Sequence, residues 1–520
     1  MPDSAVPALP FDPSPEAATA WLAALPIDNS RERCKFLFAG LQALNASRLS
    51  PLLHLQVLER LRPMVELESG QLLNSVHGKP LPMDERVRKA AKLSAQFQLE
   101  LARGFEILSQ AWPEVEDEGS RAGLLHGAML AYEQYLLRLA LMYESAPSKL
   151  WAGVHALFQL AAKDGLEERK ELGIGAVFKR LLAFRLACAT RLEQGDARLL
   201  HELLCEHGEL LNLSSEPVLD GGGADFAVDL NSGALPGPVV SGNSVAPERR
   251  YLFTGVFRRK LAQLMQASTP KAGRLDEALA SRLIVRLGGL PACAPEQKGR
   301  QAMVVGGLEA ISRVAAKAAR LKSAGGGWAG AGDLELLPLS DYGGAGPVAQ
   351  SKSSGEFAAD ASRKVSAPVA TGAIFGRAEG EYPCAVMRAE IPGLYLLETA
   401  TALRSGHLAA LNTDNTLLQV GVVGASRAQG GGRLYAFELV ANDVRPVRVF
   451  SGALSAPVNG LLAPASRDAA DISLIIPPSK LRNGSVLELE SGGRRSAYCI
   501  RRLLESTGEF TQLELTPAAT

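Results

Sequence analysis

The hydrophobic pattern of this chain changes along its length, and that change constrains the fold more than any other feature. From about residue 14 to 214, apolar residues recur at spacings of three and four, the period of an amphipathic helix. After about residue 376, short runs alternate apolar with polar residues, as around Tyr435, Phe437 and Leu439. The first pattern predicts helices packed on one another. The second favours a small antiparallel barrel.

Two segments rich in Gly, Ser, Pro or Ala divide the chain. They predict a helical domain at 1–214, a linker at 215–247, a middle segment of helices and one strand at 248–322, a flexible linker at 323–375 and a barrel domain at 376–520. The predicted fold class is multidomain α + β, with an N-terminal all-α helical domain, a small α-rich middle segment and a C-terminal antiparallel β-barrel.

Local signals predict where several elements begin and end. Asn29 and Asp84 are expected to cap helices, and Ser50 is expected to cap a helix that has Pro at its first position. Pro63 is expected to disturb that helix. The chain is expected to become helical again from Arg249, and a strand at 303–305 is expected to turn into a helix at 308–321.

Charge and cysteine usage exclude some classes of function. Lys and Arg number 55, Asp and Glu also number 55, so the net charge is zero. A general nucleic-acid binder gains its affinity from excess positive charge, so we expect no DNA or RNA partner. The six cysteines form no CxxC pair, and no signal peptide or membrane-spanning run is evident. We therefore expect a reduced, cytoplasmic protein without membrane insertion.

The sequence contains no catalytic motif, so we expect no catalytic residues and no enzyme activity. His201 and Cys205 lie at i and i+4 near His207, a spacing that can hold a metal, but a closed zinc site needs four ligands and no partner pair is visible. We expect no metal site and no cofactor. A basic cluster is interpreted as the solvated side of a helix rather than as a phosphate site: Arg249, Arg250, Arg258, Arg259 and Lys260.

Three segments near the C-terminus, 417–424, 433–440 and 445–449, resemble the end of a PilZ-type barrel. The similarity is to bacterial multidomain PilZ-like proteins that carry a long helical N-terminal region. Segments 41–45, 58–63 and 305–311 are also similar to that group. PilZ domains bind the bacterial second messenger cyclic di-GMP, so the resemblance implies a cyclic di-GMP receptor-type protein.

The family pocket combines an RxxxR segment with a [D/N]xSxxG segment. Arg can donate two hydrogen bonds to the O6/N7 edge of guanine and can stack on its plane. In this chain 388–393 corresponds to the second motif, where Gly393 matches, Arg388 replaces Asp/Asn and Glu390 replaces Ser. Arg300, within 297–301, is the nearest arginine to the basic motif, and 363–364 is a further candidate. The ligand motifs are thus divergent.

These observations lead to a main hypothesis and two alternatives. The main hypothesis is a non-catalytic effector or adaptor of cyclic di-GMP signalling with a degenerate PilZ-like domain and a protein partner. In it, Arg300 and Arg388 contact guanine or phosphate and Gly393 allows close approach, while binding orders the linker at 323–375. The alternatives are a ligand-independent interaction scaffold that pairs through a strand edge, and an unrecognised enzyme with a deep pocket of titratable groups.

Overall fold

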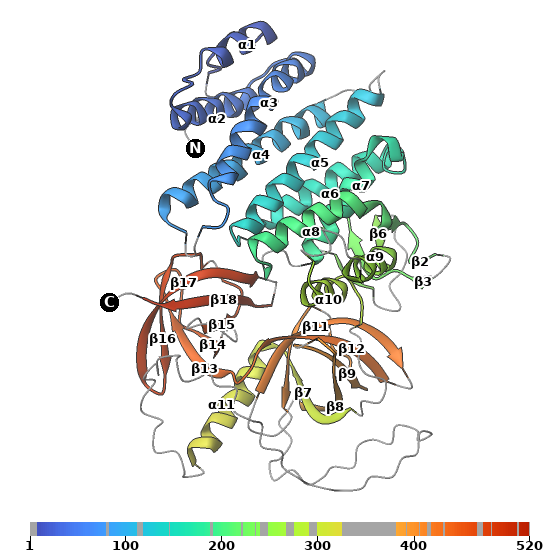
Figure 1. The fold of residues 1–520 in the computed structure, drawn as a ribbon, viewed down its shortest axis with the longest axis vertical. Helices are drawn as coiled ribbons and strands as arrows, with labels where there is room; N and C mark the ends of the chain where they lie inside the picture. The colour runs from blue at the N-terminus through green and yellow to red at the C-terminus, as the bar shows by residue number, and fades with distance from the viewer. Residues whose placement is uncertain are drawn as a thin grey trace. The chain divides into compact units, whose positions relative to one another are not determined.

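The structure is a computed structural model of the chain (Figure 1). It describes residues 8–79, 83–111, 118–144, 146–187, 191–219, 222–234, 236–239, 248–266, 275–290, 299–324, 381–391, 393–404, 406–412, 418–429, 432–464, 472–479, 481–506 and 509–518. The chain divides into two compact units, Met1–Gly288 and Gly289–Thr520. The predicted fold class, a helical N-terminal region followed by antiparallel β-barrel structure, is confirmed.

The first unit is built mainly from helices, as the periodicity predicted. Their bounds are α1 Pro15–Ala23, α2 Ser30–Ala46, α3 Pro51–Asn74, α4 Glu85–Ala111, α5 Glu118–Leu141, α6 Ser148–Lys163, η1 Lys170–Leu172, α7 Ile174–Leu186, α8 Gln194–His207 and η3 Gly208–Leu210. Their apolar stripes form one continuous core, with Leu41, Phe97 and Phe178 fully buried. Among the described residues, no helix combines the length and apolar character needed to cross a bilayer.

The predicted helix starts of the first unit are confirmed at two positions. Asn29 Oδ1 accepts a hydrogen bond from the Glu32 amide, and Asp84 Oδ1 accepts from the Val87 amide. Pro63 was expected to disturb the helix, but α3 continues through Pro63 to Asn74. Pro63 lies on the exposed face, while Leu61 and Val65 on either side are buried. Burial of the apolar face offsets the lost backbone hydrogen bond.

A small sheet completes the first unit and departs from two expectations. Its strands and the short pair beside it are β1 Asn212–Ser214, β2 Val218–Leu219, β3 Gly222–Gly223, β4 Phe226–Asp229, β5 Gly237–Pro238 and β6 Arg249–Phe253. The sheet order is β1-β6-β4-β5, so part of the predicted linker at 215–247 is paired. The helix expected from Arg249 was wrong at its start: 249–253 is a strand, and helices α9 Gly255–Gln266 and α10 Glu277–Arg286 follow it.

We expected the basic cluster to be the solvated side of a helix, but the cluster is not uniformly solvated. Arg258 donates from Nη2 to Asp225 Oδ1 at 2.8 Å, and its side chain is 21% exposed. Asp225 Oδ2 accepts from both the amide and the hydroxyl of Thr254, which is fully buried. Arg258 therefore links α9 to the loop before β4, a contact between residues distant in sequence.

The second unit begins with a closed six-stranded barrel. Its elements are β7 Arg300–Gly306, α11 Leu308–Ala324, β8 Glu381–Arg388, β9 Leu394–Thr399, β10 Leu408–Asn412, β11 Leu418–Gln429 and β12 Gly432–Ala441. The strand order around the barrel is β7-β8-β9-β12-β11-β10, and β10 pairs back to β7. The strand expected at 303–305 is therefore part of a barrel whose other strands begin at 381.

A second closed barrel follows, where the alternation had predicted one barrel in all. Its strands are β13 Arg445–Phe450, β14 Val458–Pro464, β15 Ile472–Ile476, β16 Val486–Ser491, β17 Arg494–Ser506 and β18 Thr511–Pro517. The order is β13-β14-β15-β18-β17-β16, closed by pairing of β16 with β13. Numbering the six strands of each barrel in chain order gives the same circuit, 1-2-3-6-5-4, in both.

Helix α11 contributes to a core that both barrels share. Its buried residues Ile311, Val314 and Ala315 cluster with Val420 of the first barrel and Ile475 of the second. Each barrel also has an interior of its own, formed around Phe437 in the first and Leu513 in the second. The shared core explains why these strands form one compact unit.

Candidate functional site

The structure places the three predicted ligand residues at one end of the first barrel. Arg300 is the first residue of β7, Arg388 is the last residue of β8, and Gly393 immediately precedes β9. These strands are neighbours, since β7 pairs with β8 and β8 with β9, both antiparallel. Sequence positions far apart are thus brought to a common rim, which we call the arginine rim: Arg300, Arg388, Gly393 and Tyr395.

The register also places both arginines on the inward-facing side of their strands. Arg300 is paired with Val386, which is buried in the interior of the first barrel. Arg388 lies two residues further along, so it shares the face of Val386. Such diagonal neighbours have Cα atoms roughly 7–8 Å apart. Both side chains are exposed because they lie where the strands end.

Tyr395 was not singled out from the sequence. It is paired with Arg388 across β8 and β9, and its ring meets the buried Phe437 ring edge-on, with centroids 6.1 Å apart. An aromatic ring beside a guanidinium offers a stacking surface for a planar base. The alternation of 394–399 could have indicated that Tyr395 faces inward, but only the register places it opposite Arg388.

Gly393 has a backbone conformation that favours glycine. Its φ is +86°, in the left-handed region that glycine adopts without strain. A Cβ there would find nothing closer than Leu439 Cβ at 4.0 Å. Its carbonyl accepts from the Leu439 amide at 2.7 Å. The turn conformation is therefore sufficient to explain the glycine, and its predicted contact with a ligand stays a prediction.

The charge of the arginine rim is mixed. Arg388 has no hydrogen bond or ion pair to a side chain among the described residues, so its guanidinium can bind an anion. Glu390 is exposed in the same turn, and its carboxylate opposes a negatively charged ligand. The further candidate 363–364 lies outside the described residues, as do 297–298 of the segment around Arg300 and most of the expected linker at 323–375.

The second barrel carries a separate depression of about 430 Å³. Phe450, Val486 and Glu488 line it together with the loop 451–457. Arg495 places its guanidinium carbon 3.9 Å from the centroid of the Phe450 ring, and Arg495 also pairs with Glu488 and Glu490. This arginine is already engaged by two carboxylates, so Arg388 is the better anion-binding group of the two.

Comparison with known proteins supports the receptor resemblance through the helical region. Residues 16–218 match the family model for the N-terminal domain of the cyclic-di-GMP receptor FimW. The chain is 31% identical over 219 residues to the cyclic-di-GMP receptor FimW of Pseudomonas aeruginosa. That match covers 39% of this chain and 36% of the relative. No solved structure matches the chain.

The matched residues lie in the first unit, whereas the arginine rim lies in the second. The long helical region was one part of the resemblance stated from the sequence. The comparisons confirm the receptor-type resemblance there: the helical region of this chain is similar to the N-terminal domain of a cyclic di-GMP receptor.

Proposed function

We propose that this chain is a non-catalytic effector that binds cyclic di-GMP at the arginine rim of a PilZ-like first barrel. The observation that carries the proposal is the convergence of Arg300, Arg388 and Tyr395 at one barrel end. The similarity of the helical region to a cyclic di-GMP receptor supports the choice of ligand.

The chemistry of the rim suits a guanine dinucleotide. A guanidinium can donate in parallel to O6 and N7 of guanine, or to two phosphate oxygens. Tyr395 supplies an aromatic face beside Arg388. The exposed position of both arginines allows a ligand to reach them, and Glu390 is the group that opposes it. The side chains of the rim are suited to binding charge and stacking on a planar base.

Isothermal titration calorimetry of the full chain with cyclic di-GMP tests this proposal. Arg388→Ala and Arg300→Ala should each weaken binding by about 1–3 kcal/mol, the usual loss for one bidentate guanine contact. Arg388→Lys should not restore binding, because an ammonium cannot donate bidentately. Glu390→Gln should strengthen binding.

Arg433→Ala is the matched control, because Arg433 is the second residue of β12 and pairs with Thr399 at the opposite end of the same barrel. It should bind as the unchanged protein does. If Arg388→Ala and Arg433→Ala bind equally well, the rim is not the site. If the unchanged chain gives no heat, the sensor function itself is rejected.

The helical region is proposed to contact a protein partner, in the cytoplasm and without DNA, RNA or membrane. The described cysteines Cys34, Cys205, Cys384 and Cys499 are free thiols, which suits a reducing compartment. Every described strand of both barrels is paired on two sides, so an interaction scaffold would have to use a surface other than an open barrel edge.

A further inference from the structure

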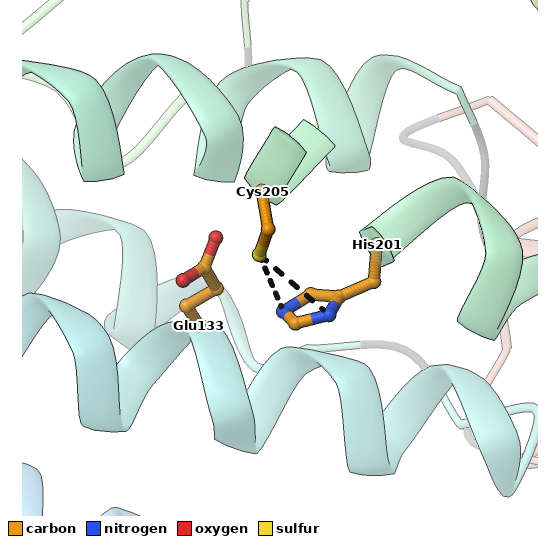
Figure 2. A group of neighbouring side chains, drawn as sticks. All are labelled: Glu133, His201 and Cys205. Carbon is orange, nitrogen blue, oxygen red and sulfur yellow. Dashed lines mark hydrogen bonds between the residues drawn. The ribbon is translucent and has the colours of Figure 1, made fainter. Parts of the chain in front are cut away.

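A cluster of metal-ligating side chains lies in the first unit, whereas the arginine rim belongs to the second unit. Figure 2 shows Glu133 from α5 facing His201 and Cys205, which lie one turn apart on α8. One ligand atom from each residue lies within 4.8 Å of the other two. Cys205 Sγ is 3.9 Å from His201 Nδ1 and 3.8 Å from Nε2. The third ligand, missing in the sequence analysis, comes from a different helix.

The distances are close to those of a bound zinc ion. Zinc bonds of roughly 2.0–2.3 Å in a tetrahedron place neighbouring ligand atoms roughly 3.3–3.8 Å apart. The sulfur-to-nitrogen distance is already in that range. A pair of ligand atoms as far apart as 4.8 Å would have to come closer by about 1 Å, which small changes of side-chain rotamer can provide.

Arg180 orients the carboxylate of this cluster. It donates from Nε to Glu133 Oε1 at 2.7 Å and from an Nη atom to Oε2 at 2.8 Å, and Glu133 is 5% exposed. Each carboxylate oxygen has two lone pairs, so one on each remains for a metal. Metal-bound carboxylates are commonly hydrogen-bonded in this way. The ion pair of Glu133 and Arg180 has no net charge. The Cys205 thiolate therefore supplies the net negative charge that partly balances the metal ion.

His201 and Cys205 both carry donor atoms that a metal entering from solvent can use. The imidazole of His201 offers a lone pair to a metal when it is neutral. Binding through the Cys205 thiolate releases the thiol proton. Cys205 is exposed, and this exposure provides both an entry route and a free coordination position for water.

We propose that Glu133, His201 and Cys205 form a zinc site with three protein ligands and one open position. One carboxylate, one imidazole and one thiolate are a ligand set that suits Zn²⁺ and excludes the hard cations Ca²⁺ and Mg²⁺. The site joins α5 to α8 within the matched region 16–218.

Titration of the metal-free full chain with Co²⁺, followed by displacement with Zn²⁺, tests the site. Thiolate ligation should give a sulfur-to-Co²⁺ charge-transfer absorption with one ion per chain, and Zn²⁺ should abolish it. Cys205→Ser should remove the charge-transfer absorption, and His201→Gln should weaken Zn²⁺ binding by about tenfold or more. Cys205 is exposed, so its replacement by Ser should leave the fold intact.

Two matched controls separate the site from adventitious binding. His207→Gln removes another imidazole of the same helix, and Cys499→Ser removes another free thiol. Both variants should bind as the unchanged protein does. The proposal is overturned if no charge-transfer absorption appears, or if Cys205→Ser binds Co²⁺ and Zn²⁺ as tightly as these controls.

Discussion

At the scale of single residues, one glycine lies where the pairing of two strands of the first barrel leaves little room for a side chain. Gly421 lies at a register shift between β11 and β12. A Cβ at this position would lie 2.4 Å from the Glu438 carbonyl oxygen and 2.4 Å from the Phe437 ring. Neither atom can move cheaply, since one is backbone and the other belongs to a fully buried ring.

Gly421→Ala should therefore destabilise the second unit by about 1–3 kcal/mol, the usual cost of overpacking a core. The matched control is Gly306→Ala, because a Cβ there meets nothing within 4 Å. Thermal unfolding of both variants measures the effect. Equal midpoints for the two variants would contradict the crowding described here.

His54 makes the helical unit sensitive to acid. Its side chain is 3% exposed, and burial lowers its pKa from the ordinary 6.5 to about 4. Between these values the unfolded chain binds a proton that the folded chain does not, so stability falls as the pH drops. The full loss for this shift is roughly 3 kcal/mol, at 1.36 kcal/mol for each pKa unit.

His54→Gln should flatten this dependence, because glutamine does not titrate. Denaturant unfolding of both proteins at pH values near 6.5 and near 4 measures the difference. Any contribution of the other histidines is common to both proteins. A parallel loss of stability in the variant would show that His54 is not the group responsible.

At the scale of elements, α3 contains a helix-interior proline that the fold tolerates. Pro63 cannot donate to the Glu59 carbonyl, and it is exposed. Pro63→Ala should stabilise the helical unit by up to about 3 kcal/mol. Pro51→Ala should change little, because Pro51 is at the first helical position, where no donor is needed. The denaturation midpoints of the two variants and the unchanged protein measure these effects. A lower midpoint for Pro63→Ala than for the unchanged protein would contradict this reasoning.

The same elements show what local sequence can and cannot predict. Caps such as Asn29 and Asp84 act within three residues, so the sequence predicts them. The strand 249–253 was missed because its partners β1 and β4 are distant in the chain, and tertiary pairing decided its conformation. The rim arginines could be named from the sequence, whereas Tyr395 and Glu133 join their sites only through register and helix packing.

At the scale of the whole molecule, the second unit contains two barrels of identical strand order. The alternation of apolar residues predicts strands but not how many barrels they close, because both barrels have the same local pattern. Strand β7 completes the first barrel, but it precedes the long segment 325–380. The sequence around β7 therefore could not show that it belongs to this barrel.

The division into units predicts where binding resides. Residues 289–520 expressed alone should bind cyclic di-GMP as the full chain does, and residues 1–288 should not bind it. Calorimetry on both fragments, each shown by circular dichroism to be folded, measures this. Binding retained by 1–288 alone would move the site into the helical unit.

The most direct test of the central claim is hydrogen–deuterium exchange of the full chain with and without cyclic di-GMP. Ligand at the arginine rim should slow amide exchange in 300–303, 385–388 and 393–396, and Arg388→Ala should remove that protection. Protection confined to the helices of 16–218 or to the second barrel would contradict the account.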